Sequence, residues 1–207
     1  MNKRNYAREL DNIIDDLQAQ GSIPRLLLHV CCAPCSSACL EFLRQYFDVT
    51  VFYYNPNITE EEEYRLRAAE EQRLIEAYNG LDARSINYTE GAYEPEVYLE
   101  RIAGLEDEPE GGKRCTECFS MRLEESAKKA AEEGFDFFTT TLTISPLKDA
   151  DRLNTIGEHY GRVFGVPFLP SDFKKKDGYK RSIELSREYG LYRQDYCGCV
   201  FSKGRPD

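Results

Sequence analysis

The sequence lacks long hydrophobic runs, since no stretch approaches the roughly 20 apolar residues that a membrane-spanning helix requires. Its N-terminus has neither an uninterrupted apolar segment nor the small-residue cleavage site of a secretory signal peptide. We therefore expect a cytoplasmic protein with no membrane partner. P-loop, GxGxxG and HExxH motifs are also absent, which removes the usual nucleotide-cofactor and metallopeptidase sites.

Cysteine, in contrast, is plentiful, with eight residues in a chain of 207. A chain of this length buries an adequate core without covalent cross-links, so stability does not explain the thiols. Structural disulfides are rare in the reducing cytosol, where clustered cysteines more often bind metals or perform redox chemistry. The cysteines are therefore the first candidates for a functional site.

The charge is unevenly distributed along the chain. A net charge of −10 argues against nucleic-acid binding, because phosphates must be met by Lys and Arg. Between Lys174 and Arg193, however, seven basic residues stand against three acidic ones, and tyrosines are interleaved with them. This pattern is typical of surfaces that bind unpaired bases and RNA backbone. An ordinary solvated surface is the equal alternative.

Hydrophobic periodicity predicts alternating strands and helices. Strands are expected at 25–30, 48–56, 83–88, 135–145 and 166–170. Helices are expected at 4–20, 34–46, 59–79, 94–105, 115–134 and 147–160, the third opened by a capping box of Thr59 and Glu62. This order indicates an α/β fold with a three-layer, mostly parallel, Rossmann-like sheet. We expect an N-terminal helical extension (1–22) and a single α/β catalytic domain (23–207), whose tail (171–207) carries Cys-Gly-Cys and covers the site.

Three thiols, Cys31, Cys32 and Cys35, follow the first strand directly. Parallel sheets carry their sites at the carboxyl ends of the strands, and a helix N-terminus there favours thiolate over thiol. Spacing alone favours Cys32 and Cys35 as a CxxC pair, because the adjacent Cys31 reaches the same centre only if the backbone turns sharply. Cys39 is expected in the core, and His29 is expected to be a hydrogen-bonded core residue.

A second CxxC pair, Cys115 and Cys118, opens a long helix, so that both sulfurs lie on one face. Two ligands are too few for zinc or an iron–sulfur cluster, both of which normally take four. The remaining ligands must come from elsewhere in the chain.

The third group is Cys197 and Cys199, which flank Gly198. A disulfide across one residue closes a small strained ring, and strain makes the bond easily reduced. The pair therefore suits electron transfer better than structural support. Two further metal ligands, or thiols without a role, are the alternative.

Five separated motifs, in this order, resemble the QueH-type epoxyqueuosine reductases: LLLHVCCAPC, FYYNPNI with EEYRLR, GKRCTECFSMRL, FTTTLTISPLK and the segment from KKKDGYKR to DYCGCVFS. The resemblance extends from about Pro24 to Ser202. It implies reductive removal of the epoxide oxygen from epoxyqueuosine at the wobble position of tRNA, the last step of queuosine biosynthesis. The implied partners are this tRNA and an unidentified electron donor.

The same resemblance implies a [4Fe–4S] cluster held by Cys31, Cys32, Cys115 and Cys118. This set departs from the spacing argument, which favours Cys35, and leaves Cys35 as either a ligand of a second metal, such as a second iron, or a neighbouring thiol. The resemblance also implies a redox-active pair at Cys197 and Cys199, the catalytic thiols of the predicted site.

Two other functions remain open at this point. A thioredoxin-like dithiol oxidoreductase would use the CAPC sequence at a strand-to-helix turn, without a metal. A zinc-stabilised RNA-binding module would use the cysteines structurally and the basic tail for binding.

Overall fold

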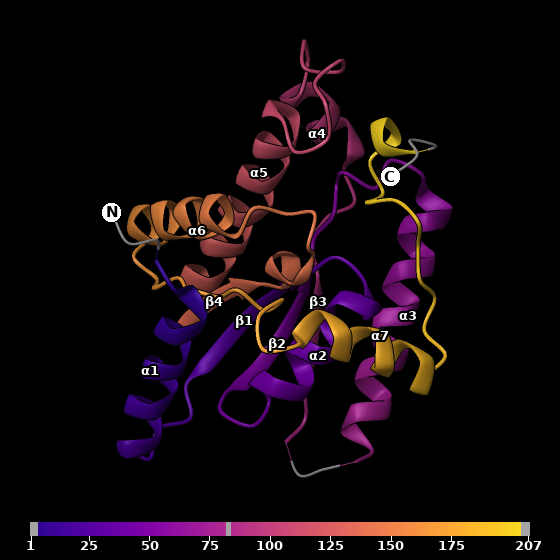
Figure 1. Ribbon diagram of the computed structural model, residues 1–207. Coiled ribbons are helices and arrows are strands. Elements are labelled where there is room, and N and C mark those ends of the chain that lie inside the picture. Colours follow the sequence, from indigo (N-terminus) through magenta and orange to yellow (C-terminus); the bar gives the residue numbers. More distant parts are fainter. Residues whose placement is uncertain (1–3, 82–83, 204–207) are drawn as a thin grey trace.

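The computed structural model describes residues 4–81 and 84–203 and shows an α/β fold built on one parallel sheet. Strands β1 (Arg25–Val30), β2 (Asp48–Tyr53), β3 (Asn87–Glu90) and β4 (Phe137–Thr140) pair in the order β3-β2-β1-β4. Their helices cover both faces of the sheet (Figure 1). The predicted three-layer, Rossmann-like α/β class is confirmed.

Helices connect the strands in the manner of βαβ crossovers. Their bounds are α1 (Tyr6–Ala19), α2 (Ala33–Leu43), α3 (Glu61–Asn79), α4 (Pro95–Arg101), α5 (Lys113–Glu132), α6 (Ala150–Phe164) and α7 (Gly178–Glu188). Two short 3₁₀ helices, Thr141–Ile144 and Val200–Ser202, follow β4 and the tail cysteines. No described helix is both long and apolar enough to cross a membrane.

Strand β1 lies at the centre of the sheet, and its residues after Arg25 are all buried. On one face Leu26 and Leu28 join a core cluster with helices α1, α2 and α3, to which α1 contributes Leu10 and Ile14. On the other face Leu27 packs with residues of α5 and α6. The prediction of a strand buried on both faces is confirmed, and the burial fixes the carboxyl end of β1 rigidly.

Several predicted boundaries are wrong for identifiable reasons. The strand expected at 135–145 ends at Thr140, because the Thr140 hydroxyl accepts a hydrogen bond from the Leu142 N–H and starts a 3₁₀ turn. Helix α3 begins after Glu60 rather than at a Thr59 capping box, and no side-chain cap bond forms there. The segment 166–170 makes only an isolated bridge between Phe168 and Phe138. Residue 83, where the third strand was expected to begin, lies outside the described residues, as do 1–3 and 204–207 of the predicted extension and tail.

Helix α7 is an element that the sequence analysis did not predict. It packs on α2 and carries the chain back toward the carboxyl ends of the strands, with the tail continuing past α3 (Figure 1). Its buried positions are limited to Ser182, Leu185 and Ser186, so it lacks a strong apolar pattern. Beyond α7, the Gln194 side-chain amide donates to the Cys32 sulfur at 2.8 Å, so the tail contacts the thiols that follow β1.

Candidate active site

The first thiol group forms at the sharp turn from β1 into α2. Cys32 is the extended residue before the helix, and its carbonyl oxygen accepts hydrogen bonds from the Cys35 and Ser36 N–H groups. This turn brings the sulfurs of Cys31, Cys32 and Cys35 within 4.8 Å of one another, with 3.7 Å between Cys31 and Cys32. The turn required to bring the two adjacent cysteines together is therefore present. Three thiolates at this spacing can bind a metal ion.

Mutual hydrogen bonding separates the acidities of these thiols. Bonds from Cys32 and Cys35 hold the pKa of Cys31 well below its usual range. The same interaction with Cys31, together with burial, raises the pKa of Cys32 to about 12 and that of Cys35 above its ordinary value. The group therefore concentrates one negative charge at Cys31 and keeps its neighbours protonated, a state that a metal ion would change by displacing the protons.

The second group lies in the first turn of α5. The Cys115 sulfur accepts a hydrogen bond from the Gly111 N–H at 3.2 Å, while Cys118 is buried beside Arg122, one helical turn further on. The Arg122 Nη1 lies 3.8 Å from the Cys118 sulfur. Burial raises the pKa of both thiols, to about 11 for Cys118.

The third group is held in place by buried side chains of helix α3 and the preceding loop. Arg67, which is 1% exposed, donates to the carbonyl oxygens of Tyr196 and Cys197 at 3.3 and 3.2 Å. Asn57 donates to the Cys197 carbonyl oxygen at 3.4 Å. Gly198 has φ +100°, and a Cβ there would lie 2.6 Å from the Ile58 side chain. Only glycine therefore allows the tail to pass this close to the loop before α3.

The two tail sulfurs are in different surroundings. The Cys197 sulfur lies 3.1 Å from the Ser202 hydroxyl, and the Cys199 sulfur lies 3.0 Å from the Tyr98 hydroxyl. A hydrogen bond from Cys199 holds the pKa of Cys197 well below its usual range, whereas the pKa of Cys199 is raised. A thiolate beside a protonated thiol is the arrangement that reversible disulfide chemistry requires.

Two adjoining cavities bring the groups together. A cavity of about 80 Å³ is lined by Cys115, Cys118, Cys197 and Cys199. A larger one, of about 310 Å³, is lined by Cys35 and Cys197 and shares the residue Lys148 with the first. Cys197 lines both cavities and thus lies between Cys35 and the α5 pair, whereas Cys199 lines the smaller cavity.

The four sulfurs predicted to hold one cluster do not form a single close group. Among residues 4–81 and 84–203, the close set of three is Cys31, Cys32 and Cys35, and the α5 pair lies outside it. Cys115 nevertheless packs against the core cluster that contains Cys31 and Cys32. Burial acts to lower the pKa of the Arg122 guanidinium, but the neighbouring Cys118 and Cys31 sulfurs raise it overall. The four-ligand set remains a prediction.

A network of buried polar side chains connects helix α5 to strand β1 beside the thiols. Arg122 donates to the Asn55 side-chain oxygen at 2.6 Å and to the His29 Nε2 at 3.2 Å, and His29 Nδ1 lies 2.9 Å from the Thr140 hydroxyl. Burial, with the charge of Arg122, lowers the pKa of His29 to about 3, so the ring is neutral. The prediction that His29 is a hydrogen-bonded core residue is confirmed. Arg122 and Asn55 were not predicted, although the i, i+4 spacing of Cys118 and Arg122 was a usable signal.

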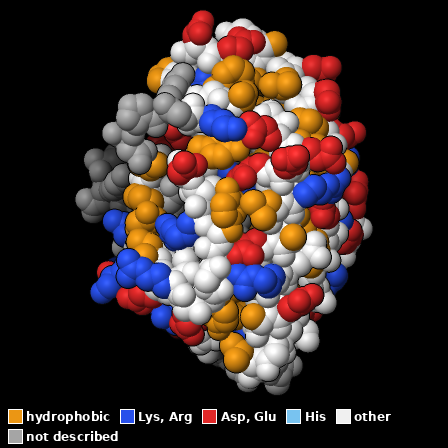
Figure 2. Space-filling view, turned by 90° about the vertical axis from the view of Figure 1, so that its right-hand side faces the viewer, with side chains coloured by type: hydrophobic (Ala, Val, Ile, Leu, Met, Phe, Trp, Pro, Cys, Tyr) orange, Lys and Arg blue, Asp and Glu red, His pale blue; other side chains and the backbone are white. Residues whose placement is uncertain are grey.

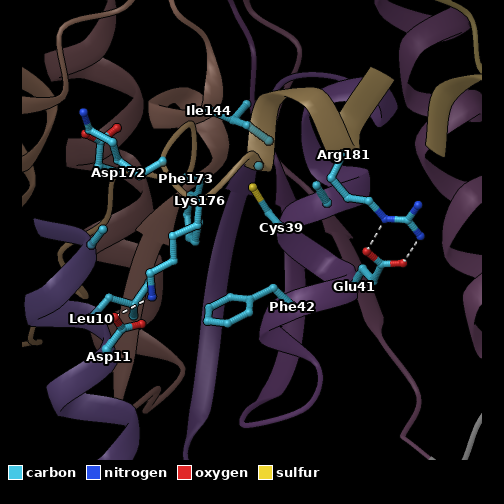
Figure 3. Close-up of a pocket in the computed structure, with 14 residues that line it drawn as sticks. Leu10, Asp11, Cys39, Glu41, Phe42, Ile144, Asp172, Phe173, Lys176 and Arg181 are labelled. Carbon is cyan, nitrogen blue, oxygen red and sulfur yellow. Dashed lines mark hydrogen bonds and ion pairs between the residues drawn. The ribbon is translucent and has the colours of Figure 1, made fainter. Parts of the chain in front are cut away.

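Cys39 lies away from these cavities, and its expected place in the core is confirmed. It is 1% exposed and lies 3.4 Å from the Cys35 carbonyl oxygen. Its sulfur lines a separate cavity of about 180 Å³ between α1, α2 and the loop before α7 (Figure 3). Ion pairs of Lys176 with Asp11 and of Arg181 with Glu41 lie at its rim. A single thiol in a mostly apolar cavity offers no evident chemistry.

Ion pairs also neutralise part of the basic segment. Lys174 lies 2.7 Å from Asp172 and Lys176 lies 2.5 Å from Asp11, whereas the described residues give Lys175 no ion pair. On the face seen in Figure 2, basic and acidic side chains are interspersed. The charged side chains on this face therefore do not form one patch of a single sign.

Comparisons with known proteins agree with the motifs. The family described as Epoxyqueuosine reductase QueH matches residues 26–205. A protein named Epoxyqueuosine reductase QueH from Staphylococcus epidermidis is 46% identical over 97% of this chain and 85% of its own length. Proteins of the same name from Streptococcus pyogenes and Thermotoga maritima are 44% and 36% identical, over 97% and 86% of this chain and 78% and 89% of their own.

Proposed function

The chain belongs to the QueH family of epoxyqueuosine reductases, which are oxidoreductases, and from this membership we propose the reaction that it catalyses. It removes the epoxide oxygen of epoxyqueuosine at the wobble position of tRNA and yields queuosine and water, as the last step of queuosine biosynthesis in the cytoplasm. The removal consumes two electrons and two protons, so the site must have a source of both.

The convergence of thiols at the end of β1 is the observation that carries this proposal. The sulfurs of Cys31, Cys32 and Cys35 lie within 4.8 Å of one another at the edge of a rigid sheet. Cys35 also lines the cavity into which Cys197 projects. One thiol of the proposed metal-binding group and one thiol of the proposed redox pair thus border the same open cavity, which suits a reductive deoxygenation.

The donor set fits an iron–sulfur centre, because such clusters are held by cysteine thiolates. We assign Cys31, Cys32, Cys115 and Cys118 to a [4Fe–4S] cluster, and Cys35 to a second iron. When bound, such a centre passes electrons singly and an iron polarises an oxygen atom. The buried guanidinium of Arg122, beside Cys118, offsets the negative charge that several thiolates bring into the interior.

The reaction requires two electrons, whereas an iron–sulfur centre passes them one at a time. Cys197 and Cys199 together store the pair. The Cys197 thiolate and the Cys199 thiol hold two electrons and one proton, which are released together when the disulfide forms, and the second proton comes from solvent. The hydrogen bonds of Arg67 and Asn57 to the Cys197 carbonyl oxygen fix the pair at the cavity. An electron donor then reduces the disulfide for the next turnover.

The test is an anaerobic preparation assayed with tRNA that carries epoxyqueuosine. We expect a brown protein with iron and acid-labile sulfide that converts the nucleoside to one lighter by a single oxygen atom, as measured by mass spectrometry. Colourless protein with zinc and no turnover would support an RNA-binding module. Turnover by metal-free protein would support a dithiol oxidoreductase. Either result would contradict the iron–sulfur proposal.

A further inference from the structure

Lys148 borders the cavities of the site but has no role in the thiol chemistry described above. It lines the 310 Å³ cavity beside Cys35, the 80 Å³ cavity beside Cys118, and a groove of about 670 Å³ that the basic segment borders. Among the residues that line these three spaces, Lys148 is the one common to all of them. The Lys148 side chain therefore lies between the two thiol cavities and the groove bordered by the basic segment.

The backbone of Lys148 is held in a tight turn before helix α6. Its N–H donates to the Ser145 carbonyl oxygen at 3.2 Å, and the Leu147 N–H donates to the Ser145 hydroxyl at 3.3 Å. The next residue, Asp149, caps α6 by accepting hydrogen bonds from the N–H groups of Asp151 and Arg152. Because the turn and the helix cap are fixed together, the position of Lys148 relative to the cavities is fixed as well.

The other cations lining the two thiol cavities are already engaged. Arg122 bonds Asn55 and His29, Arg152 bonds the Thr116 hydroxyl, Arg114 bonds the Glu106 carbonyl oxygen, and Arg193 bonds the Ser186 hydroxyl. The described part of the chain gives the Lys148 ammonium no hydrogen bond or ion pair. Among the described residues that line the two thiol cavities, Lys148 is thus the cation whose side-chain donors remain available to a ligand.

Partial burial of an unpaired ammonium group costs free energy, because burial weakens its hydration. A fixed positive charge there interacts strongly with any negative charge that develops on a bound molecule. When the C–O bonds of an epoxide break, negative charge develops on the oxygen atom. The cavity therefore places a preorganised donor beside the thiols that reduce the substrate.

We propose that Lys148 is a catalytic residue, whose ammonium group donates a hydrogen bond to the epoxide oxygen and stabilises the charge on it as the C–O bonds break. This role rests on the proposed function. Both C–O bonds break and a C=C bond forms, while the Cys197 thiolate and the Cys199 thiol supply two electrons and one proton and become a disulfide, and solvent water supplies the second proton. The oxygen leaves as water, Lys148 retains its proton, and a dithiol reductant restores Cys197 and Cys199.

The experiment compares single-turnover rates of the loaded wild-type enzyme with those of Lys148→Met, Lys148→Arg and the control Lys128→Met. Lys128 lies exposed on α5 and, within the described part of the chain, pairs with the exposed Glu125, so its variant should behave as the wild type. Loss of one charge-stabilising donor typically costs about a hundredfold or more in rate. We expect this loss in Lys148→Met, with tRNA affinity within threefold of wild type, and partial recovery in Lys148→Arg.

Iron content and the visible spectrum, measured on the same samples, separate catalysis from assembly of the site. A Lys148→Met rate within threefold of wild type would overturn the proposal. So would a rate loss matched by an equal loss of tRNA affinity, which would make Lys148 a phosphate-binding residue, or a rate loss matched by loss of iron in both Lys148 variants. Failure of the wild type itself to convert the substrate would overturn the proposed function and this role together.

Discussion

The hydroxyl of Tyr98 lies 3.0 Å from the Cys199 sulfur, so helix α4 contacts the tail thiol pair directly. This hydrogen bond exists only while Cys199 is reduced, and it therefore stabilises the dithiol relative to the disulfide. The bond is buried, since Tyr98 is 1% exposed. An unpaired buried hydroxyl is costly, so the pairing contributes to both redox balance and packing.

Replacing Tyr98 by Phe should make the pair more strongly reducing. Loss of a hydrogen bond worth about 1 kcal/mol corresponds to about 20 mV for a two-electron couple, toward more negative potential. Equilibration with a dithiol buffer measures this value. Tyr46→Phe, three residues after the last residue of α2, is the control and should leave the potential unchanged. An identical potential in Tyr98→Phe would show that the contact does not act on the thiols.

A methyl group at Gly198 should displace the tail. The added Cβ would lie 2.6 Å from Ile58 and 3.2 Å from the Arg67 guanidinium, at a φ of +100° that only glycine adopts readily. We expect Gly198→Ala to lower the free energy of unfolding by about 1–3 kcal/mol and turnover by at least about tenfold. Gly190→Ala is the matched control, because its φ is +58° and nothing lies within 4 Å of its Cβ. Equal loss of turnover in both variants would mean that the clash at Gly198 is unimportant.

The proposed ligand set predicts a pattern of iron content. Serine at Cys31, Cys32, Cys115 or Cys118 should remove most of the iron and sulfide, whereas serine at Cys35 should leave the sulfide in place. Cys39→Ala should retain both, because Cys39 lies in the core beyond the site. Metal and sulfide analysis of anaerobic preparations measures these contents. Full iron and sulfide in the Cys115 and Cys118 variants would instead indicate a centre held by the β1 thiols alone.

The sequence was sufficient to predict the elements that carry the site, but not all of their limits. The apolar run before Cys31 and Pro34 after it predicted β1 and α2 correctly, because burial and helix-start geometry are local. The run of threonines suggested a longer fourth strand, yet the Thr140 hydroxyl bonds the backbone and ends it. Helix α7 was missed because Gly178 opens it and its buried face is partly serine.

Sequence reasoning also found the three thiol groups but not the side chains around them. Their placement depends on contacts between distant segments, such as Tyr98 with Cys199 and Arg67 with Cys197. Lys148 was visible only as part of a motif, because nothing in its local spacing shows that it borders two cavities. Sequence spacing shows which residues are neighbours on one element, whereas this site is assembled from segments far apart in the chain.

A buried carboxyl group gives a prediction for pH. Glu71 is fully buried on α3 and accepts a hydrogen bond from Ser36 at 2.8 Å, and burial raises its pKa to about 8. The unfolded chain loses this proton near pH 4.5, so the Glu71 contribution to stability is full below that pH and falls as pH rises toward 8. Glu71→Gln should remove this decline. Its advantage over wild type in urea unfolding should therefore grow between pH 5 and 8, and a constant difference would contradict a buried, protonated Glu71.

The basic segment gives a prediction for salt dependence. Each phosphate contact that a Lys makes contributes roughly one unit to the slope of log affinity against log salt. Reversing the charges at Lys174, Lys175 and Lys176 should weaken tRNA binding and make this slope shallower by up to about three units. Lys174 and Lys176 are paired with Asp172 and Asp11 in the free protein, so they contribute fully only if tRNA displaces those carboxylates.

Lys175→Glu alone therefore distinguishes the available cation from the paired ones. Its exposed side chain has no ion pair among the described residues, so we expect it to account for about one unit of slope. Arg162→Glu, exposed near the end of α6, is the control for a general change in charge. Binding measured over a salt series gives each slope. An unchanged slope in the triple variant would exclude this segment as the tRNA-binding surface. Each phosphate that the protein neutralises releases counterions and therefore contributes to the slope.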